Sequence, residues 1–504
     1  MKKPTRLTYL FTSVAVAGTI ALAGCSATTS ATSTSTATGT SVSSSASTSA
    51  TAVATSTGET VTSAISYDTH YDADDLTWDT SSETTIDLSN PTATDGVSVK
   101  DGVITITAGG NYRLTGTLKD GQIVVTAGEE DIVRLILDSA TITNSGGPAV
   151  DAESANEVIV YTASGTTNTV TDGSSYTATG TDDPDAALFA RTDLTLAGEG
   201  TLKVAGNYAD GIASSDGLVI AGGTINVTAV DDGIKGKDYV DILGGTVDVT
   251  AASDGIKSTN DTDAERGWTR LLDGTVTVSA GDDGFKSERE LEIAGGTLTI
   301  NESNEAIEGQ YITISGGKTN VTSSDDAINA TIPSDNSSTT SGGMGGGMNQ
   351  AVDAWIAISG GEITLNTEGD GIDSNGTAEI SGGTVVINGP STGGNGATDA
   401  TGGLTITGGT LIQGDAGDMF EGMEGAYVRF SASVSSGDTV TVTDSSGKTV
   451  AEYTSTKNIS AVVVAGSSIS EGASYTISVN GSEAGTATAT SGSSGAAMGG
   501  GFRR

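Results

Sequence analysis

Acidic side chains recur at one position of a repeated phrase, and they are the residues in this sequence best suited to chemistry. The phrase is Asp-Gly followed by Ile or Phe, as in DDGIKG, SDGIKS and DDGFKS. A carboxylate stands before the Gly, or before the Ala that replaces it, at Asp210, Asp232, Asp254, Asp283, Glu305, Asp326 and Asp370. A second carboxylate precedes it at Asp231, Asp282 and Asp325. Carboxylate oxygens without Cys or His partners favour Ca²⁺.

Stacking these carboxylates on one another has an energetic cost. Two unit charges about 4.8 Å apart, one strand spacing, repel by roughly 3 to 4 kcal/mol at an effective dielectric of 20. Repeated over several repeats, this repulsion approaches a typical net stability of about 5–15 kcal/mol. We therefore expect positive charge beside the row. Two residues after the Gly the sequence places Lys235, Lys257 and Lys286, which neutralise part of it.

A bound Ca²⁺ would neutralise the rest. The insert Thr259–Glu265 (TNDTDAE) adds carboxylates at alternate positions, which we expect beside Asp254 and Asp283. The predicted metal ligands are Asp210, Asp231, Asp232, Asp254, Asn260, Asp261, Asp263, Asp282 and Asp283. The alternative is that Asp-Gly is ordinary turn chemistry with solvated charges.

A second row is aromatic. Six residues before the second Gly of each Gly-Gly pair stand Tyr239, Trp268, Glu290, Tyr311 and Trp355. Strand alternation points this row outward, where stacked aromatic rings would form a flat platform for the apolar faces of sugar rings. Acidic sugars would pair with Lys235, Lys257 and Lys286. The alternative is that surface aromatic side chains need no ligand.

The spacing of the repeats predicts the fold that positions both rows. From Gly211 to Ala327 the marker residues are 22, 22, 29, 22 and 21 residues apart, a period typical of stacked repeats. Alternating apolar residues around each Gly-Gly pair predict short, half-buried strands. We predict an all-β parallel β-helix of about 22 residues per coil. Its core ladder should be Ile212, Ile234, Ile256, Phe285, Ile307, Ile328 and Ile372.

The chain divides into six predicted segments. Residues 1–24 resemble a lipoprotein signal peptide, and 25–66 form a Ser/Thr/Ala-rich linker. Residues 67–200 are irregular β-helix coils and a cap, and 201–425 are the regular β-helix with inserts 259–265 and 331–352. Residues 426–490 form a small antiparallel β module, and 491–504 a disordered tail.

The predicted signal ends at Leu22-Ala23-Gly24-Cys25, which looks like a lipobox. By resemblance to bacterial lipoproteins, Cys25 would be lipidated and would anchor the chain to the membrane from the extracellular side. Cys25 is the only cysteine, so there is no disulfide framework. The alternative is an ordinary signal peptide with an incidental cysteine.

Composition excludes several function classes. Without the three signal cations the chain carries 19 basic and 63 acidic residues, which argues against nucleic acid as a partner. His70 is the sole histidine and lies outside the repeats, so serine, cysteine or zinc hydrolysis is not expected. Aromatic residues are 4% of the chain, which suits the narrow core of a β-helix. We expect a monomer.

The stretches GQIVVTAGEEDIVRLILDSATITNSGGPAV, NYADGIASSDGLVIAGGTINVTAVDDGIKGKD and SDGIKSTNDTDAERG resemble the secreted carbohydrate-binding-domain proteins of bacteria. The resemblance covers about residues 68–430. It implies a right-handed parallel β-helix, related in fold to pectate lyases, that binds Ca²⁺ and cellulose-like or polygalacturonate polymers. On this basis we expect a calcium-dependent polysaccharide-binding surface lipoprotein and no enzyme.

Two other functions remain open from the sequence. In a pectate-lyase-like polysaccharide lyase, Lys257 or Lys286 would abstract the proton next to a uronate carboxylate. Nearby carboxylates favour the ammonium form of lysine, which argues against this role. A structural adhesin or wall spacer would have no glycan specificity.

Overall fold

The computed structural model describes residues 53–54, 60–61, 66–177, 180, 183–332, 351–417 and 419–492. The predicted signal peptide, Cys25, most of the linker and of insert 331–352, and the tail from residue 493 lie outside the described residues. In the predicted linker, β1 (Val53–Ala54) pairs with β2 (Thr60–Val61). Among the described residues, no helix has the length and apolarity needed to cross a bilayer.

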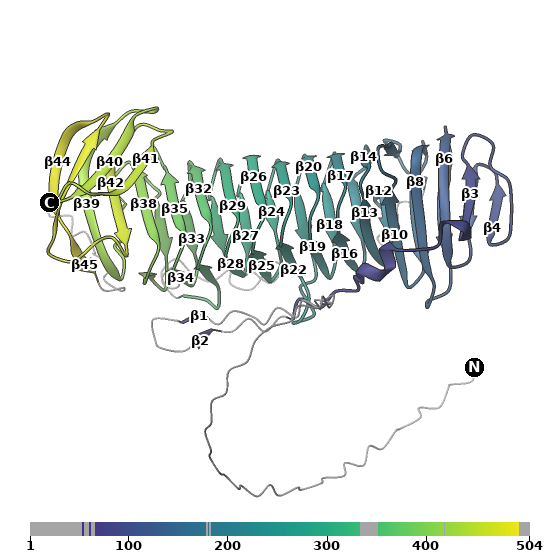
Figure 1. The fold of residues 1–504 in the computed structure, drawn as a ribbon, viewed down its shortest axis with the longest axis horizontal. Helices are drawn as coiled ribbons and strands as arrows, with labels where there is room; N and C mark the ends of the chain where they lie inside the picture. Colours follow the sequence, from purple (N-terminus) through teal and green to yellow (C-terminus); the bar gives the residue numbers. More distant parts are fainter. Residues whose placement is uncertain are drawn as a thin grey trace, which may run out of the picture. The chain divides into compact units, whose positions relative to one another are not determined.

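The chain from β3 to β38 winds into a parallel β-helix, as predicted (Figure 1). A regular coil such as residues 234–251 contributes three short strands, one to each of three faces. Each strand pairs in parallel with its equivalent one coil away, so residues of one repeat position form a row along the molecule.

The acidic face is the sheet whose strands follow the Asp-Gly turns. It has 13 strands: β4 (Val97–Lys100), β5 (Val103–Ile106), β7 (Gln122–Thr126), β9 (Val150–Ser154), β12 (Ala186–Ala190), β15 (Asp210–Ser214), β18 (Ile234–Gly236), β21 (Ile256–Ser258), β24 (Phe285–Lys286), β27 (Ile307–Gly309), β30 (Ile328–Ala330), β33 (Ile372–Ser374) and β36 (Thr398–Ala400).

The aromatic face follows in each coil. Its strands are β3 (Glu83–Asp87), β6 (Gly110–Leu118), β8 (Ile132–Thr143), β10 (Glu157–Thr162), β13 (Asp193–Gly198), β16 (Gly217–Ile220), β19 (Tyr239–Ile242), β22 (Trp268–Leu271), β25 (Glu290–Ile293), β28 (Tyr311–Ile314), β31 (Trp355–Ile358), β34 (Thr377–Ile380) and β37 (Leu404–Ile406).

The threonine face follows the Gly-Gly turns. Its strands are β11 (Thr167–Thr171), β14 (Thr201–Gly206), β17 (Thr224–Ala229), β20 (Thr246–Ala251), β23 (Thr275–Ser279), β26 (Thr297–Glu302), β29 (Lys318–Ser323), β32 (Glu362–Thr367), β35 (Thr384–Asn388) and β38 (Thr410–Asp415). This face begins with the second half of β8, which pairs in parallel with residues 169–171 of β11.

The turn between the aromatic and threonine faces explains the Gly-Gly pairs. Gly245 has φ +95°, a region that glycine adopts without penalty. A Cβ at Gly245 would lie 2.8 Å from the carbonyl oxygen of Gly223 in the preceding coil. The coils therefore stack closely only when this position lacks a side chain.

The predicted isoleucine column forms the core. Ile212, Ile234 and Ile256 are in register with one another, and Ile256 is in register with Phe285. Ile307 and Ile328 continue the row. All of these side chains and Ile372 are buried in one continuous hydrophobic cluster, so burial of apolar side chains holds each coil to the next.

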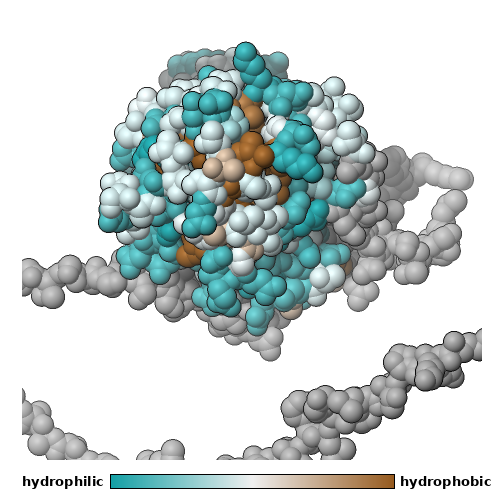
Figure 2. Space-filling model, turned by 90° about the vertical axis from the view of Figure 1, so that its right-hand side faces the viewer, coloured by the Kyte–Doolittle hydropathy of each residue, from teal (hydrophilic) through white to brown (hydrophobic). Residues whose placement is uncertain are grey.

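Both ends of the solenoid are closed. At the N-terminal end, β4 pairs antiparallel with β5. Figure 2 looks onto this end and shows hydrophobic residues only near its centre, surrounded by hydrophilic ones. Covering the end protects apolar surface and strand edges.

A C-terminal antiparallel module is present, as predicted. β42 (Ile459–Gly466) pairs antiparallel with β38 and with β39 (Gly425–Val434), and β45 (Thr490–Gly492) adds to β39. A second sheet has the order β41 (Thr449–Thr454), β40 (Thr439–Asp444), β43 (Ser474–Val479) and β44 (Ser482–Thr488). The module has its own hydrophobic cluster.

Candidate functional site

The acidic residues of the repeat lie at the start of the acidic-face strands, one per coil. The backbone N–H of Asp232 donates to Oδ1 of Asp210 at 3.1 Å, and that of Asp254 donates to Oδ1 of Asp232 at 3.2 Å. Asp283 repeats the bond to Asp254 at 3.0 Å. Each carboxylate thus holds the turn of the next coil, a structural role that is independent of any ligand.

The lysines lie between these carboxylates, as predicted. Lys257 Nζ is 2.6 Å from Asp232 Oδ2 and 3.0 Å from Asp254 Oδ2. Lys235 pairs with Asp210, and with Asp185 at 3.2 Å. The remaining lysine, Lys286, lies 2.6 Å from Asp283 and 2.7 Å from Glu308.

These ion pairs bear on the other roles predicted for the lysines. Burial lowers the pKa of Lys257, but Asp232 and Asp254 raise it by more, so the net shift is upward. The pKa of Lys286 is raised in the same way by Asp283 and Glu308. A lysine held as ammonium between two carboxylates is a poor general base and is not available to a uronate.

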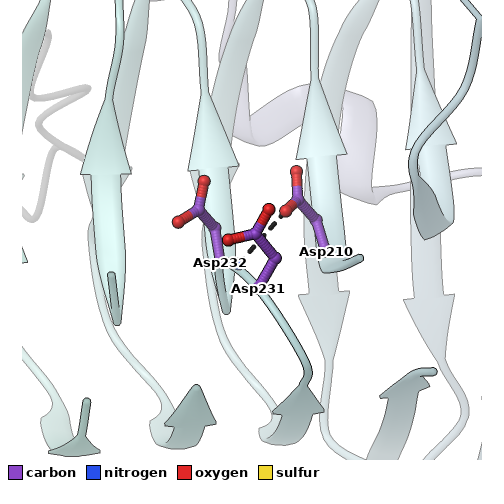
Figure 3. A group of neighbouring side chains, drawn as sticks. All are labelled: Asp210, Asp231 and Asp232. Atoms are coloured by element: carbon purple, nitrogen blue, oxygen red, sulfur yellow. Dashed lines mark hydrogen bonds between the residues drawn. The ribbon is translucent and has the colours of Figure 1, made fainter. Parts of the chain in front are cut away.

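Three groups bring carboxylate oxygens within 4.8 Å of one another: Asp210 with Asp231 and Asp232, Asp254 with Asp282 and Asp283, and Asp283 with Glu305 and Glu308. In the first group, Asp231 lies between the two ladder carboxylates (Figure 3). In the first two groups Asp231 and Asp282 are exposed, whereas the ladder residues are buried. Each of the first two groups therefore has one carboxylate that faces solvent.

The chemistry of these groups fits a hard cation. Every donor is a carboxylate oxygen, which suits Ca²⁺ and not a soft metal. Burial raises the pKa of Asp210 to about 7 even though Lys235 lowers it. Burial and a hydrogen bond to Glu308 raise the pKa of Asp283. The ionised form of these carboxyl groups is therefore disfavoured despite the lysines, and a divalent cation would stabilise it.

The insert does not join these groups, contrary to our expectation. It follows β21, so it lies at the opposite end of that strand from Asp254. Asn260 donates to Asp238 at 2.7 Å, and its own oxygen accepts the N–H groups of Thr262 and Asp263. Among the described residues, Asn260, Asp261 and Asp263 belong to no carboxylate group of this kind. The insert is a turn that is tied to its neighbours through Asp238 and through Arg289, which donates to the Asp261 carbonyl oxygen at 3.0 Å.

The aromatic row has the predicted register but is no open platform. Tyr239 pairs with Trp268, and Tyr311 pairs with Trp355. The rings of Tyr239 and Trp268 stack on one another at 4.6 Å and 9°, and those of Tyr311 and Trp355 at 5.4 Å and 26°. Rings one strand spacing apart thus stack face to face, and these faces are not available to a ligand. Tyr239, Trp268 and Trp355 are buried, and only Tyr311 is half-buried.

Residues 67–82, which we call the N-terminal strap, cover part of this row. The strap contains two short 3₁₀ turns, η1 (Ala73–Leu76) and η2 (Thr80–Ser82), and runs beneath the labels β10 to β22 in Figure 1. The ring of Tyr67 packs edge-on against Trp268 at 5.0 Å, and its hydroxyl donates to Glu290 at 2.7 Å. Further along, Arg134 on β8 binds Asp75 at 3.0 Å.

His70 belongs to the strap and lies on the β-helix, whereas the sequence placed it outside the repeats. Its Nδ1 is 2.7 Å from the Tyr239 hydroxyl, and its Nε2 is 2.9 Å from the Thr195 hydroxyl. Thr195 donates its own proton to Glu157 at 2.6 Å, so it accepts from Nε2–H. His70 therefore fastens the strap across three coils.

Sequence reasoning missed a change along the acidic face. Glu308 occupies the lysine slot of its coil, followed in register by Asn329, Asp373 and Asp399. Among the described residues, no lysine or arginine forms an ion pair with the last two. Burial raises the pKa of Asp370 to about 7, and it also raises the pKa of Asp373. The change from Lys to Glu, Asn and Asp in one slot was visible in the sequence.

Comparison with known proteins gives one family and two relatives. Residues 100–354 match the model of a family described as carbohydrate-binding domain-containing protein. A protein of that description from Acetivibrio thermocellus is 38% identical over 145 residues, which are 28% of this chain and 51% of the relative. The chain thus matches about half of that relative's length.

A solved structure is also similar to part of the chain. It is described as the polysaccharide lyase-like protein from C. thermocellum in a gadolinium derivative, and it is 33% identical. The match covers 48% of this chain and 94% of that structure, with a TM-score of 0.42.

Proposed function

The chain belongs to the family of carbohydrate-binding domain-containing proteins, and from that premise we propose that it is a calcium-dependent polysaccharide-binding protein of the cell surface. The calcium dependence rests on two carboxylate groups, one at Asp231 and one at Asp282. In each group one exposed carboxylate lies beside two buried carboxylates. The formal net charge of the chain is −41, so an acidic polymer is repelled unless a cation lies between the two.

The residues that would hold the cation follow from the site. Asp231 and Asp282 have no ion pair among the described residues, so their oxygens are available. Asp232 and Asp254 would supply the buried side of each group. A bound Ca²⁺ supplies the positive charge to which a uronate carboxylate binds. The ladder residues orient the site through their backbone hydrogen bonds to the next coil.

Binding to soluble polygalacturonate tests this proposal directly. We expect the wild-type protein to bind in millimolar Ca²⁺ and to lose binding in a chelator. The double variant Asp231→Asn/Asp282→Asn should bind at least tenfold more weakly. The matched control is Asp273→Asn, an exposed carboxylate in a Gly-Gly slot. Binding that is equal in chelator and in Ca²⁺ would refute the calcium dependence.

Anchoring to the membrane is part of the same proposal and rests on the lipobox-like motif Leu22-Ala23-Gly24-Cys25. Two or more acyl chains on Cys25 would hold the protein stably at a bilayer. In cells, Cys25→Ser should move the protein from the membrane fraction to the medium, with loss of the lipid mass. A Cys25→Ser protein that stays in the membrane fraction would contradict lipid anchoring.

A further inference from the structure

The threonine face carries a regular array of short, uncharged side chains. Its first outward row is unbroken over six successive strands, in register: Thr167, Thr201, Thr224, Thr246, Thr275 and Thr297. A second row lies two residues further along each strand: Thr169, Lys203, Asn226, Asp248, Thr277 and Thr299. Every member of both rows is exposed or half-buried.

Strand propensity alone does not explain this array. Threonine favours strands in general, so it would be equally common on the outside of the other two faces. The equivalent row of the aromatic face instead reads Glu157, Asp193, Gly217, Tyr239 and Trp268. That of the acidic face reads Asp151, Phe189, Ala213, Lys235, Lys257 and Lys286.

The charge of the two threonine-face rows sets them apart from the rest of the molecule. Lys203 and Asp248 are their only charged members and have opposite signs. The chain as a whole has 63 acidic and 22 basic residues. A neutral partner therefore meets no net charge on these two rows, whereas beside the Asp-Gly turns of the acidic face it would have to desolvate carboxylates.

Access also favours the threonine face. The strap covers the aromatic face between β8 and β25, and ion pairs line the outside of the acidic face. The threonine-face strands from β14 to β35 lie side by side in Figure 1. The six threonines of the first row span five strand spacings of about 4.8 Å, which is a length of about 24 Å. Short side chains in register over this length form an extended surface, which suits a polymer more than a small molecule.

We propose that the threonine face binds a neutral, extended polysaccharide of the cellulose type, separately from the acidic face. Each threonine offers a methyl group and a hydroxyl. A flat sugar chain likewise presents C–H groups on its ring faces and hydroxyls at its edges, so the two surfaces match in chemistry as well as in charge. This inference rests on the proposed polysaccharide binding and assigns it a second, cation-independent surface.

Binding to microcrystalline cellulose in a chelator tests the assignment. The variant Thr246→Lys/Thr275→Lys replaces two exposed threonines of the first row. Its matched control is Thr449→Lys/Thr454→Lys, which makes the same change at two exposed positions of β41. For the first variant we expect cellulose binding at least tenfold weaker than that of the wild type. For the control we expect cellulose binding equal to that of the wild type. Thr246→Val/Thr275→Val keeps the side-chain shape and should weaken binding by a smaller factor.

The outcomes separate this inference from the proposed function. Wild-type protein that binds polygalacturonate in Ca²⁺ but not cellulose would overturn the inference alone. The inference would also be overturned if Thr246→Lys/Thr275→Lys melted like the wild type and bound cellulose as strongly as the control variant. Protein that binds neither polymer would overturn the proposed function as well. Both lysine variants should keep calcium-dependent binding to polygalacturonate.

Discussion

Lys257 joins two coils, because its Nζ lies 2.6 Å from Oδ2 of Asp232 in the preceding coil and also pairs with Asp254 of its own. Both carboxylates are buried, and the lysine side chain is 19% exposed. The ammonium therefore neutralises part of the charge of the stacked carboxylates at this point. Lys235 and Lys286 also bridge two coils, but with other partners: Lys235 pairs with Asp185 and Asp210, and Lys286 pairs with Asp283 and Glu308.

Replacing Lys257 by Met should destabilise the protein strongly. Removing one partner of a buried ion pair leaves the other charge uncompensated and costs about 3–5 kcal/mol. We expect a loss of that size in the free energy of unfolding, measured by urea denaturation in a chelator. Lys237→Met, at an exposed lysine of the preceding coil, should change it by less than about 0.5 kcal/mol. Equal effects of the two variants would contradict the bridging role.

Trp268 should contribute to stability and not to ligand contact. Its side chain is fully buried between Tyr239 and Tyr67. Trp268→Ala should lower the free energy of unfolding by about 3–5 kcal/mol. Tyr311→Ala, at the half-buried ring of the same row, should cost less. If Trp268→Ala melted like wild type but lost polysaccharide binding, the open-platform interpretation would be correct after all.

The strap should shield Trp268 from solvent. In a Trp78→Phe/Trp355→Phe background Trp268 is the one remaining tryptophan, so its fluorescence reports this position alone. Tyr67→Ala should then increase acrylamide quenching several-fold, because the ring that packs on Trp268 is removed. The control is Tyr71→Ala, which changes another tyrosine of the strap. Unchanged quenching in Tyr67→Ala would mean that the strap does not cover the row in solution.

The C-terminal part of the acidic face should weaken as pH rises. Burial raises the pKa of Asp370 from 3.8 to about 7, so between these values the folded protein holds a proton that the unfolded chain releases. Its stabilising effect is present below pH 4 and is lost as pH rises through 7.

Asp370→Asn should remove this pH dependence, because the amide oxygen still accepts the Gly396 N–H. At pH 8 the variant should be more stable than wild type by about 1–3 kcal/mol, since one pKa unit is about 1.4 kcal/mol and the site is partly solvated. At pH 4.5 the two should be nearly equal. Urea denaturation at both pH values measures the difference. A variant less stable than wild type at pH 8 would contradict the assignment.

The sequence predicted the fold well because a repeat shows the same environment many times. Ile234 and Ile256 have the same neighbours, one coil apart, and the period alone identified their row. The ion pairs of Lys257 followed from the same register, since a fixed offset from the Gly fixes both partners in space.

What the sequence did not predict depends on features outside the repeat. The strap comes from a segment without periodicity, so nothing near His70 indicated that it crosses the face of Tyr239. The position of Asn260 follows from the insert's place after the C-terminal end of β21, whereas the Asp-Gly turn precedes the N-terminal end of that strand. The stacking of Tyr239 on Trp268 was predictable in principle, because rings one strand spacing apart contact each other before any ligand.

Thermal melting with and without Ca²⁺ tests the central claim most directly, namely that the acidic turns hold a cation. In chelator-treated protein at pH 7.5, millimolar Ca²⁺ should raise the melting temperature by several degrees, since a ligand that binds only the folded state stabilises it. The Asp231→Asn/Asp282→Asn variant should lose most of this increase, and Asp273→Asn should keep it. A melting temperature that Ca²⁺ leaves unchanged in the wild-type protein would contradict the account.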